Sequence, residues 1–344
     1  MARHLSTTRT FIVVAALRLA SVACPHSADS VGLGGTCQWA NASACVRNTS
    51  QCVVLPTGGA SVDCGPAHQQ CAQPFASAPR FHIMDRSGCG MNDPNGPFYD
   101  ELHGMYHVFW QDHLALPRGG RGHGSIWGHA ASKDLATWTM LPVALWNDRD
   151  WDDTALFTGS ATIVDGNPVL MYPGMTQTYP GGDNLAIATP ANRSDPLLKE
   201  WVKPSSGPMV NHTHADPTSA WRTEWGEWRL HDKSGQVYAT QDPRFVSGFV
   251  RVPNYTIPNT GECSSLFPLP RCTPGAVCNA TTAQPGPTHV HKHSTYADRT
   301  YRLRIDQMIV GTLTEAPPGK PGTWTSQGRH QEIDRTFYCT LSTH

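Results

Sequence analysis

Three acidic residues are candidates for catalytic carboxyl groups: Asp93, Asp216 and Glu262. Carboxyl groups act as nucleophiles and as general acids or bases, so each residue is a candidate catalytic group. Asp93 lies in Gly-Met-Asn-Asp-Pro-Asn-Gly-Pro at residues 90–97, where nearly every residue favours a sharp turn. Taken alone, Asp93 suits a hairpin turn equally well. In isolation a turn cap is the simpler interpretation of Asp216, and an exposed strand-end acid that of Glu262.

Several short segments of distinctive sequence contain these acids or lie between them. In chain order these are Met-Asn-Asp-Pro-Asn-Gly at residues 91–96, Tyr-His-Val-Phe-Trp-Gln at 106–111, Trp-Gly-His-Ala-Ala-Ser-Lys-Asp-Leu at 127–135, Phe-Thr-Gly-Ser-Ala-Thr at 157–162, Asp-Pro-Thr-Ser-Ala-Trp at 216–221 and Gly-Glu-Cys at 261–263. So many segments in one order make coincidence an implausible explanation.

Together these segments resemble the motifs of glycoside hydrolase family 32, the invertase and fructan hydrolase group, over roughly residues 81–339. The resemblance implies that Asp93 is the nucleophile and that Glu262 is the general acid/base. It also implies that Asp216 holds hydroxyl groups of the fructose ring and stabilises the transition state. Further substrate-binding residues implied by the resemblance are Asn92, Gln111, Trp127, Phe157 and Thr158.

The chemistry of a retaining glycosidase explains why acids so far apart in sequence must meet. Two carboxyl groups ~5 Å apart are required, one ionised to attack the anomeric carbon and one protonated to release the leaving oxygen. Because carboxyl groups fill both roles, we expect no metal and no organic cofactor.

The sequence departs from the family pattern next to the predicted site. His214-Ala215 stands where the family has an arginine before Asp216, and Gly90 replaces the usual tryptophan before the Met-Asn-Asp segment. Gly-rich residues 119–124 replace another tryptophan, and Ser264-Ser265 replaces a common Pro-Asp. A lost charged hydrogen bond to a sugar hydroxyl costs roughly 1.5–3 kcal/mol, so we expect catalysis to be weakened without being abolished.

Short apolar runs at residues 105–110, 161–164 and 168–172 have the length of strands and are separated by Gly, Pro, Asn and Asp. No stretch of a dozen residues shows capped helical periodicity, so the sequence predicts an all-β sandwich, barrel or propeller. The family resemblance implies a five-bladed β-propeller whose inner strands each deliver one acid to a central funnel.

Residues 332–338 resemble a segment of the family's fourth blade, after which a fifth blade and a C-terminal β-sandwich would follow. Because the chain stops at His344, we expect about four blades and no sandwich domain. Three interpretations remain open: a truncated gene, an abbreviated active enzyme, or a degenerate sugar-binding protein.

The N-terminal region favours secretion. Residues 1–23 resemble a signal peptide, with Arg3 and Arg9 ahead of an apolar run at residues 11–20. Residues 24–80 form a Cys-rich segment, and residues 81–344 are assigned to the incomplete propeller. Eleven Cys favour an oxidising compartment, and their odd number leaves one thiol unpaired or joined to another chain. Six glycosylation sequons agree with the secretory pathway. They begin at Asn41, Asn48, Asn192, Asn211, Asn254 and Asn279.

The charge balance favours a neutral partner. Lys and Arg number 26 against 27 Asp and Glu, which disfavours nucleic acid and an anionic membrane surface. Residues 271–293 are predicted to be a surface insertion pinned by a disulfide. The His-Val-His-Lys-His tract at residues 289–293 could bind a metal, although an exposed polar tract is the simpler interpretation.

The leading hypothesis is therefore a secreted β-fructofuranosidase-type hydrolase that acts on sucrose or a fructan. A fructosyltransferase would use the same residues, with a sugar hydroxyl in place of water. A non-catalytic carbohydrate-binding protein is the competing class, favoured by Ala215 and disfavoured by the presence of all three acids. The sequence does not indicate an oligomeric state.

Overall fold

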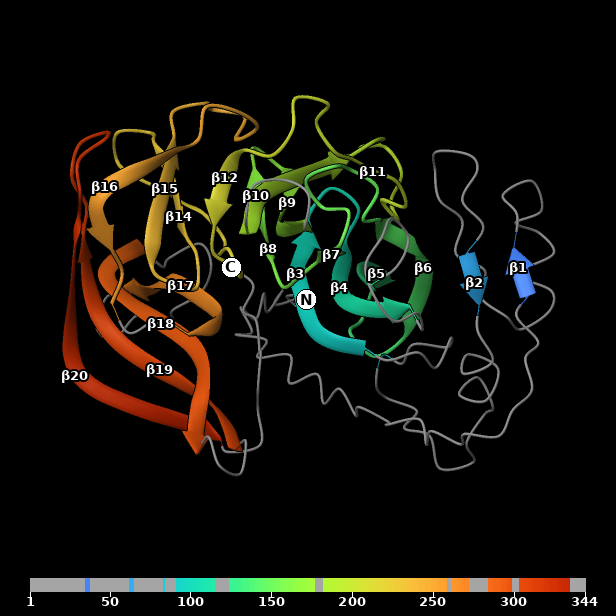
Figure 1. Ribbon diagram of the computed structural model, residues 1–344. Coiled ribbons are helices and arrows are strands. Elements are labelled where there is room, and N and C mark those ends of the chain that lie inside the picture. The colour runs from blue at the N-terminus through green and yellow to red at the C-terminus, as the bar shows by residue number, and fades with distance from the viewer. Residues whose placement is uncertain are drawn as a thin grey trace, which may run out of the picture.

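Strands account for all the regular structure in the part of the chain that the computed structural model describes (Figure 1). The described residues are 35–37, 62–64, 83, 91–114, 124–176, 182–258, 261–271, 284–298 and 303–334. The three apolar runs predicted to be strands lie in β4, β8 and β9. The prediction of an all-β fold is thereby confirmed.

The first two large sheets are formed by residues 91–213. The first sheet has the order β3-β4-β5-β6, with β3 (Met91–Asp100), β4 (Met105–Leu114), β5 (Gly124–Ser132) and β6 (Trp138–Leu145). The second sheet is built on β9 (Asn167–Thr176) and β10 (Gly182–Pro190), which β7 (Ala155–Leu156), β8 (Ser160–Val164), β11 (Trp201–Val202) and β12 (Val210–Thr213) extend.

The third and fourth sheets repeat the simple up-and-down order of the first. The third contains β13 (Trp221–Arg222), β14 (Trp228–His231), β15 (Gln236–Thr240) and β16 (Val250–Thr256). The fourth contains β17 (Glu262–Arg271), β18 (Gln284–Asp298), β19 (Leu303–Thr314) and β20 (Thr323–Asp334). A separate two-stranded sheet pairs β1 (Gly35–Cys37) with β2 (Val62–Cys64).

The hydrophobic core lies between successive sheets, as in a propeller. Phe109 of the first sheet packs in one cluster with Leu170 and Tyr172 of the second. The next cluster joins the second sheet to the third, and another joins Val237 of the third to Ile309 of the fourth. Each sheet therefore buries its faces against its neighbours, and the four sheets form a four-blade propeller arrangement (Figure 1).

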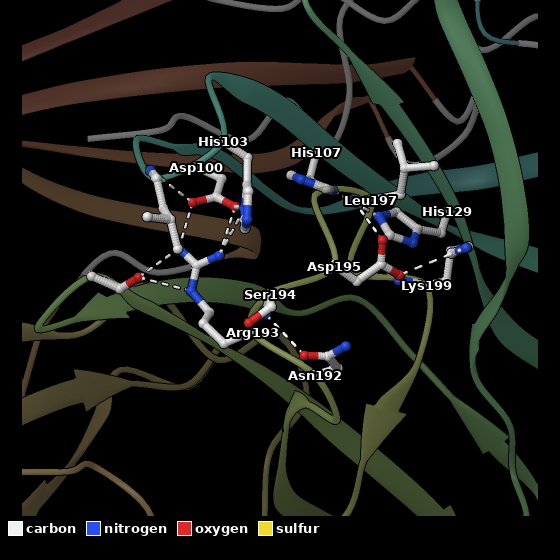
Figure 2. Close-up of polar contacts among 12 residues, drawn as sticks. Asp100, His103, His107, His129, Asn192, Arg193, Ser194, Asp195, Leu197 and Lys199 are labelled. Atoms are coloured by element: carbon white, nitrogen blue, oxygen red, sulfur yellow. Dashed lines mark hydrogen bonds and ion pairs between the residues drawn. The ribbon is translucent and has the colours of Figure 1, made fainter.

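A largely buried ion pair joins the first sheet to the second. Arg193, which follows β10, donates two hydrogen bonds to the carboxylate of Asp100 at the end of β3 (Figure 2). His103 contacts the same carboxylate through Nδ1 at 2.7 Å, and Arg193 also donates to the carbonyl of Gly166 at 2.8 Å. Burial works to raise the pKa of Asp100, but the bonds from Arg193 and His103 outweigh it and hold the pKa at about 2.

A second buried cation joins the third sheet to the fourth. Arg229 of β14 is fully buried and donates from Nε to Glu227 at 2.7 Å and from Nη1 to Glu315, which follows β19. Its remaining nitrogen bonds three backbone carbonyls near the β19–β20 turn. Because each of its three nitrogens has a partner, the guanidinium fixes the position of that turn.

The predicted surface insertion is wrong for its C-terminal part. Residues 284–293 belong to β18, and His291 and His293 are buried, at 0% and 4% exposure. His291 packs against His231 of β14 and Trp324 of β20, so inter-sheet packing buries a tract that composition alone suggests is exposed. The predicted signal peptide, and most of the Cys-rich segment, lie outside the described residues. No helix in the described part of the chain has the length and apolar character needed to cross a membrane.

We predict that Arg193→Met lowers the free energy of unfolding by about 3 kcal/mol, because it leaves the Asp100 carboxylate buried without its cation. Lys199→Met is the matched control in the same turn, since Lys199 makes only an exposed ion pair with Asp195 at 3.8 Å. The control should lose less than about 1 kcal/mol. Urea unfolding of both variants measures the difference, and equal losses would contradict the structural role of Arg193.

Candidate active site

Asp93 lies in the first strand of the first sheet and is held by the neighbouring sheet. Thr158, in the segment between β7 and β8, donates its hydroxyl to Asp93 Oδ2 at 2.7 Å. Gln111 of β4 donates from Nε2 to Thr158 Oγ1 at 2.7 Å and lies 3.5 Å from Asp93 Oδ2. Ser125 of β5 donates to Gln111 Oε1 at 3.4 Å, which orients the amide. The half-buried Asp93 carboxylate is therefore fixed by a network of side chains that spans two sheets.

Asp216 and Cys263 meet through the backbone. Asp216 precedes the third sheet, and Cys263 is the second residue of β17 in the fourth. The amide of Cys263 donates to Asp216 Oδ2 at 2.8 Å. Both residues have left-handed backbone conformations, with φ of 60° and 51°. Such conformations cost roughly 1–3 kcal/mol each in residues other than glycine, and they cluster where the surrounding structure requires a particular side-chain position.

All three predicted acids lie in one region. The Sγ atom of Cys263 is 3.8 Å from Asp93 Oδ2, and Glu262 is the adjacent residue in β17. Because Cys263 is disulfide-bonded, it has no thiol proton, and the short approach is a packing contact. Burial raises the pKa of Asp216 to about 7, and the charges of Asp93 and Glu262 add to this effect. The Cys263 amide and the charge of Lys233 oppose the rise without cancelling it. Asp216 is thus protonated in mildly acidic solution.

Trp127 supports the segment that carries Thr158. Its side chain is fully buried, and its indole N–H donates to the carbonyl of Phe157 at 3.0 Å. Gly159 lies so close to β9 that a Cβ atom there would be 2.0 Å from the Met171 carbonyl oxygen. These contacts hold the segment that carries Thr158. For Trp127 this placement favours a supporting role over the direct substrate contact that the resemblance implies.

The two remaining predicted residues differ in exposure. Asn92 is exposed beside Asp93, and Phe157 is half-buried ahead of Thr158. Three residues of the site were missed by sequence reasoning: Ser125, Cys263 and Lys292. Cys263 stood in a recognised motif, whereas Lys292 stood in the His-rich tract of the predicted surface insertion. Only the pairing of β17 with β18 and the bond from Lys292 to the Cys263 carbonyl place Lys292 beside the site.

The chemistry of the site rests on carboxyl groups. One half-buried carboxylate, one buried protonated carboxyl and a third half-buried acid provide a nucleophile and proton donors within one region. Among the residues that the structure describes, no group of three or more His, Cys, Asp and Glu side chains could hold a metal ion.

Comparison with known proteins gives consistent matches. The family model of the glycosyl hydrolases family 32 N-terminal domain matches residues 82–340. An acid beta-fructofuranosidase of Vicia faba is 37% identical over 206 residues, covering 55% of this chain and 31% of the relative. A vacuolar acid beta-fructofuranosidase of Arabidopsis thaliana is 35% identical over 261 residues, covering 71% and 36%. The chain thus spans about a third of the length of these relatives.

A solved structure supports the fold. Fructan 1-exohydrolase IIa from Cichorium intybus is 28% identical, with a TM-score of 0.51 over 69% of this chain and 44% of that one. A variant of that enzyme has been solved in complex with 1-kestose, with the same TM-score and identity.

We predict that the raised pKa of Asp216 makes the protein less stable as the pH rises. An unfolded aspartate releases its proton near pH 3.8, whereas folded Asp216 keeps it until about pH 7. The stabilisation is therefore complete below pH 3.8 and is lost as the pH rises to 7, with a slope of ~1.4 kcal/mol per pH unit.

Buried histidines with lowered pKa, such as His129 and His231, oppose this trend, so the difference between the wild type and Asp216→Asn must be measured. Urea unfolding at a series of pH values gives that difference. If the two proteins show parallel curves between pH 4 and 7, the pKa assigned to Asp216 is wrong.

Proposed function

Because the chain belongs to glycoside hydrolase family 32, we propose that it releases terminal β-fructofuranosyl units from sucrose or a fructan by a retaining mechanism. The observation that carries the proposal is the meeting of Asp93 in the first sheet, Asp216 just before the third, and Glu262-Cys263 at the start of the fourth. Asp93 and Glu262, more than a hundred residues apart in the sequence, lie in one region, as a two-carboxyl mechanism requires.

In the first step Asp93 attacks C2 of the fructosyl unit, and the bond from C2 to the glycosidic oxygen breaks. Glu262 gives its proton to that oxygen, so the leaving sugar departs as a neutral alcohol. In the second step the Glu262 carboxylate removes a proton from water as the water oxygen attacks C2. The bond between C2 and Asp93 breaks, which releases fructose and restores both acids.

Asp216 suits the role of a group that binds the fructose ring. Below its pKa of about 7 the carboxyl is neutral and can both donate a hydrogen bond to a sugar hydroxyl and accept one. A neutral Asp216 also spares the site a further negative charge beside Asp93. Gln111 and Thr158 hold the Asp93 carboxylate in the direction of attack.

The alternative of sugar binding without turnover rests on Ala215, which stands where the family has an arginine. Incubation with sucrose or 1-kestose separates the possibilities by their products. Free fructose indicates hydrolysis, and longer oligosaccharides indicate transfer to another sugar. Saturable binding with no product indicates a carbohydrate-binding protein.

Relatives and sequence features support the proposed substrate and compartment. Sucrose or a fructan as the substrate is supported by the 1-kestose complex of the Cichorium intybus enzyme and by the fructofuranosidases among the relatives. The apolar run at residues 11–20 and the sequons support passage through the secretory pathway to an extracellular or vacuolar compartment. The four sheets are proposed to be blades of the five-bladed propeller that the family resemblance implies.

We predict that Asp93→Asn and Glu262→Gln each lower kcat for sucrose or 1-kestose by several orders of magnitude, because each removes one of the two required carboxyl groups. Asp165→Asn is the matched control, since Asp165 is an exposed turn aspartate outside the site. Initial rates of fructose release measure the effect. Wild-type activity should also fall as the pH rises past 7, where Asp216 loses its proton. Near-native rates in either site variant refute the proposed roles.

A milder effect is predicted for Thr158→Val, which removes the hydroxyl that donates to Asp93. Loss of one hydrogen bond to a charged group costs roughly 1.5–3 kcal/mol, so kcat should fall about ten- to a hundredfold. Thr139→Val on the exposed face of β6 provides the control and should leave kcat unchanged. A Thr158→Val enzyme with the wild-type kcat would show that the hydroxyl does not position Asp93.

A further inference from the structure

A lysine of the fourth sheet is buried directly behind the candidate site. Lys292 lies in β18, where it pairs with Ser265 of β17, and its side chain is 5% exposed. Its Nζ atom donates to the carbonyl oxygen of Cys263 at 3.3 Å, to Ser294 Oγ at 3.3 Å and to Asp306 Oδ2 at 3.2 Å. A charged amine is costly to bury, so its position requires an explanation beyond packing.

The carbonyl that Lys292 holds belongs to Cys263, the residue of β17 that links two of the acids. Cys263 has φ of 51°, a conformation disfavoured for residues with a side chain. Its amide holds Asp216 at 2.8 Å, and the preceding residue is Glu262. The peptide group before Cys263 is thus held through its N–H by the Asp216 carboxyl. The peptide group after Cys263 is held through its carbonyl by the Lys292 ammonium.

The charges facing Lys292 come from several elements. Burial lowers the pKa of Lys292 to about 8, whereas its ion-pair partner Asp306 of β19, together with Asp93 of β3 and Asp216, favours the charged form. His291, its neighbour in β18, is held neutral by burial and by the charges of nearby groups, including Lys292. An ammonium within range of Asp93 and Asp216 favours their ionised forms in return, because the interaction between two charges is mutual.

We propose that Lys292 is a positioning residue for the candidate site: its ammonium holds the Cys263 carbonyl and supplies a positive charge that favours the close approach of the acids. This inference rests on the proposed function for its kinetic consequences alone. Its electrostatic part concerns the folded protein whether or not the protein turns over a substrate.

An ordinary structural ion pair between Lys292 and Asp306 would give the same contacts, so the test must separate the charge of Lys292 from the loss of the pair. Removing Lys292 alone leaves the Asp306 carboxylate buried without its cation, which disturbs the fold and adds a titrating acid. The suitable comparison is therefore Asp306→Asn with the double variant Lys292→Met/Asp306→Asn. Both lack the Asp306 carboxyl, and they differ only in the lysine.

The first measurement is the pKa of Asp216 itself, read from the carboxyl carbon resonance of full-length protein labelled at aspartate Cγ. The resonance is identified by its absence in Asp216→Asn. We expect this pKa to be at least about 0.5 unit higher in the double variant than in Asp306→Asn, because a nearby cation favours the ionised form. Equal values in the two variants would overturn the proposal.

The second measurement is the pH profile of fructose release from sucrose. In the double variant both limbs of the pH profile should lie at higher pH than in Asp306→Asn, by a similar amount. Its kcat should be about tenfold lower than that of Asp306→Asn. A lower kcat with an unchanged pH profile would indicate a structural role only and would overturn the electrostatic assignment. If the wild type releases no fructose, the proposed function fails, and the Asp216 titration still decides the role of Lys292.

Discussion

Mutual repulsion among carboxyl groups is the constraint on which the arrangement of this site depends. Asp93, Asp216 and Glu262 act on one another electrostatically, and three ionised acids in so small a region would oppose folding. The structure relieves the repulsion chiefly by burial, which raises the pKa of Asp216 to about 7 and leaves it neutral in mild acid. Hydrogen bonds from Thr158 and from the Cys263 amide then fix the direction of two of the carboxyl groups.

The propeller arrangement supplies the rigidity that such a site needs. Each candidate acid lies at or near the first strand of a different sheet, and the hydrophobic clusters between sheets fix those strands relative to one another. Arg193 and Arg229 add polar links across two of the same boundaries. The strained backbone at Asp216 and Cys263 is maintained because packing on both sides determines where those residues lie. Local strain at the site is thus offset by contacts made elsewhere between the sheets.

The strands and the motif residues could be predicted because alternation and residue type are local properties of the sequence. The runs at residues 105–110, 161–164 and 168–172 fall within strands, and the three acids meet as the motif order implied. Long-range pairing could not be predicted in the same way. Residues 91–97 suggested a turn but form the start of β3, whose pairing with β4 shifts register between Met91 and Pro94 and between Asn95 and Phe98. The burial of His291 and the approach of Lys292 to Cys263 depend on the register between β17 and β18.

The missing arginine before Asp216 has a consequence that can be argued from charge. Ala215 provides no cation, but the positive charges of two lysines act on Asp216. Lys233, whose amide donates to the Ala215 carbonyl at 2.9 Å, lowers the pKa of Asp216 by its charge, and Lys292 interacts electrostatically with the same carboxyl. An arginine would also have donated hydrogen bonds in a fixed geometry, which two ammonium groups do not reproduce. The substitution should therefore reduce the precision with which a sugar hydroxyl is held more than it alters the protonation of the acids.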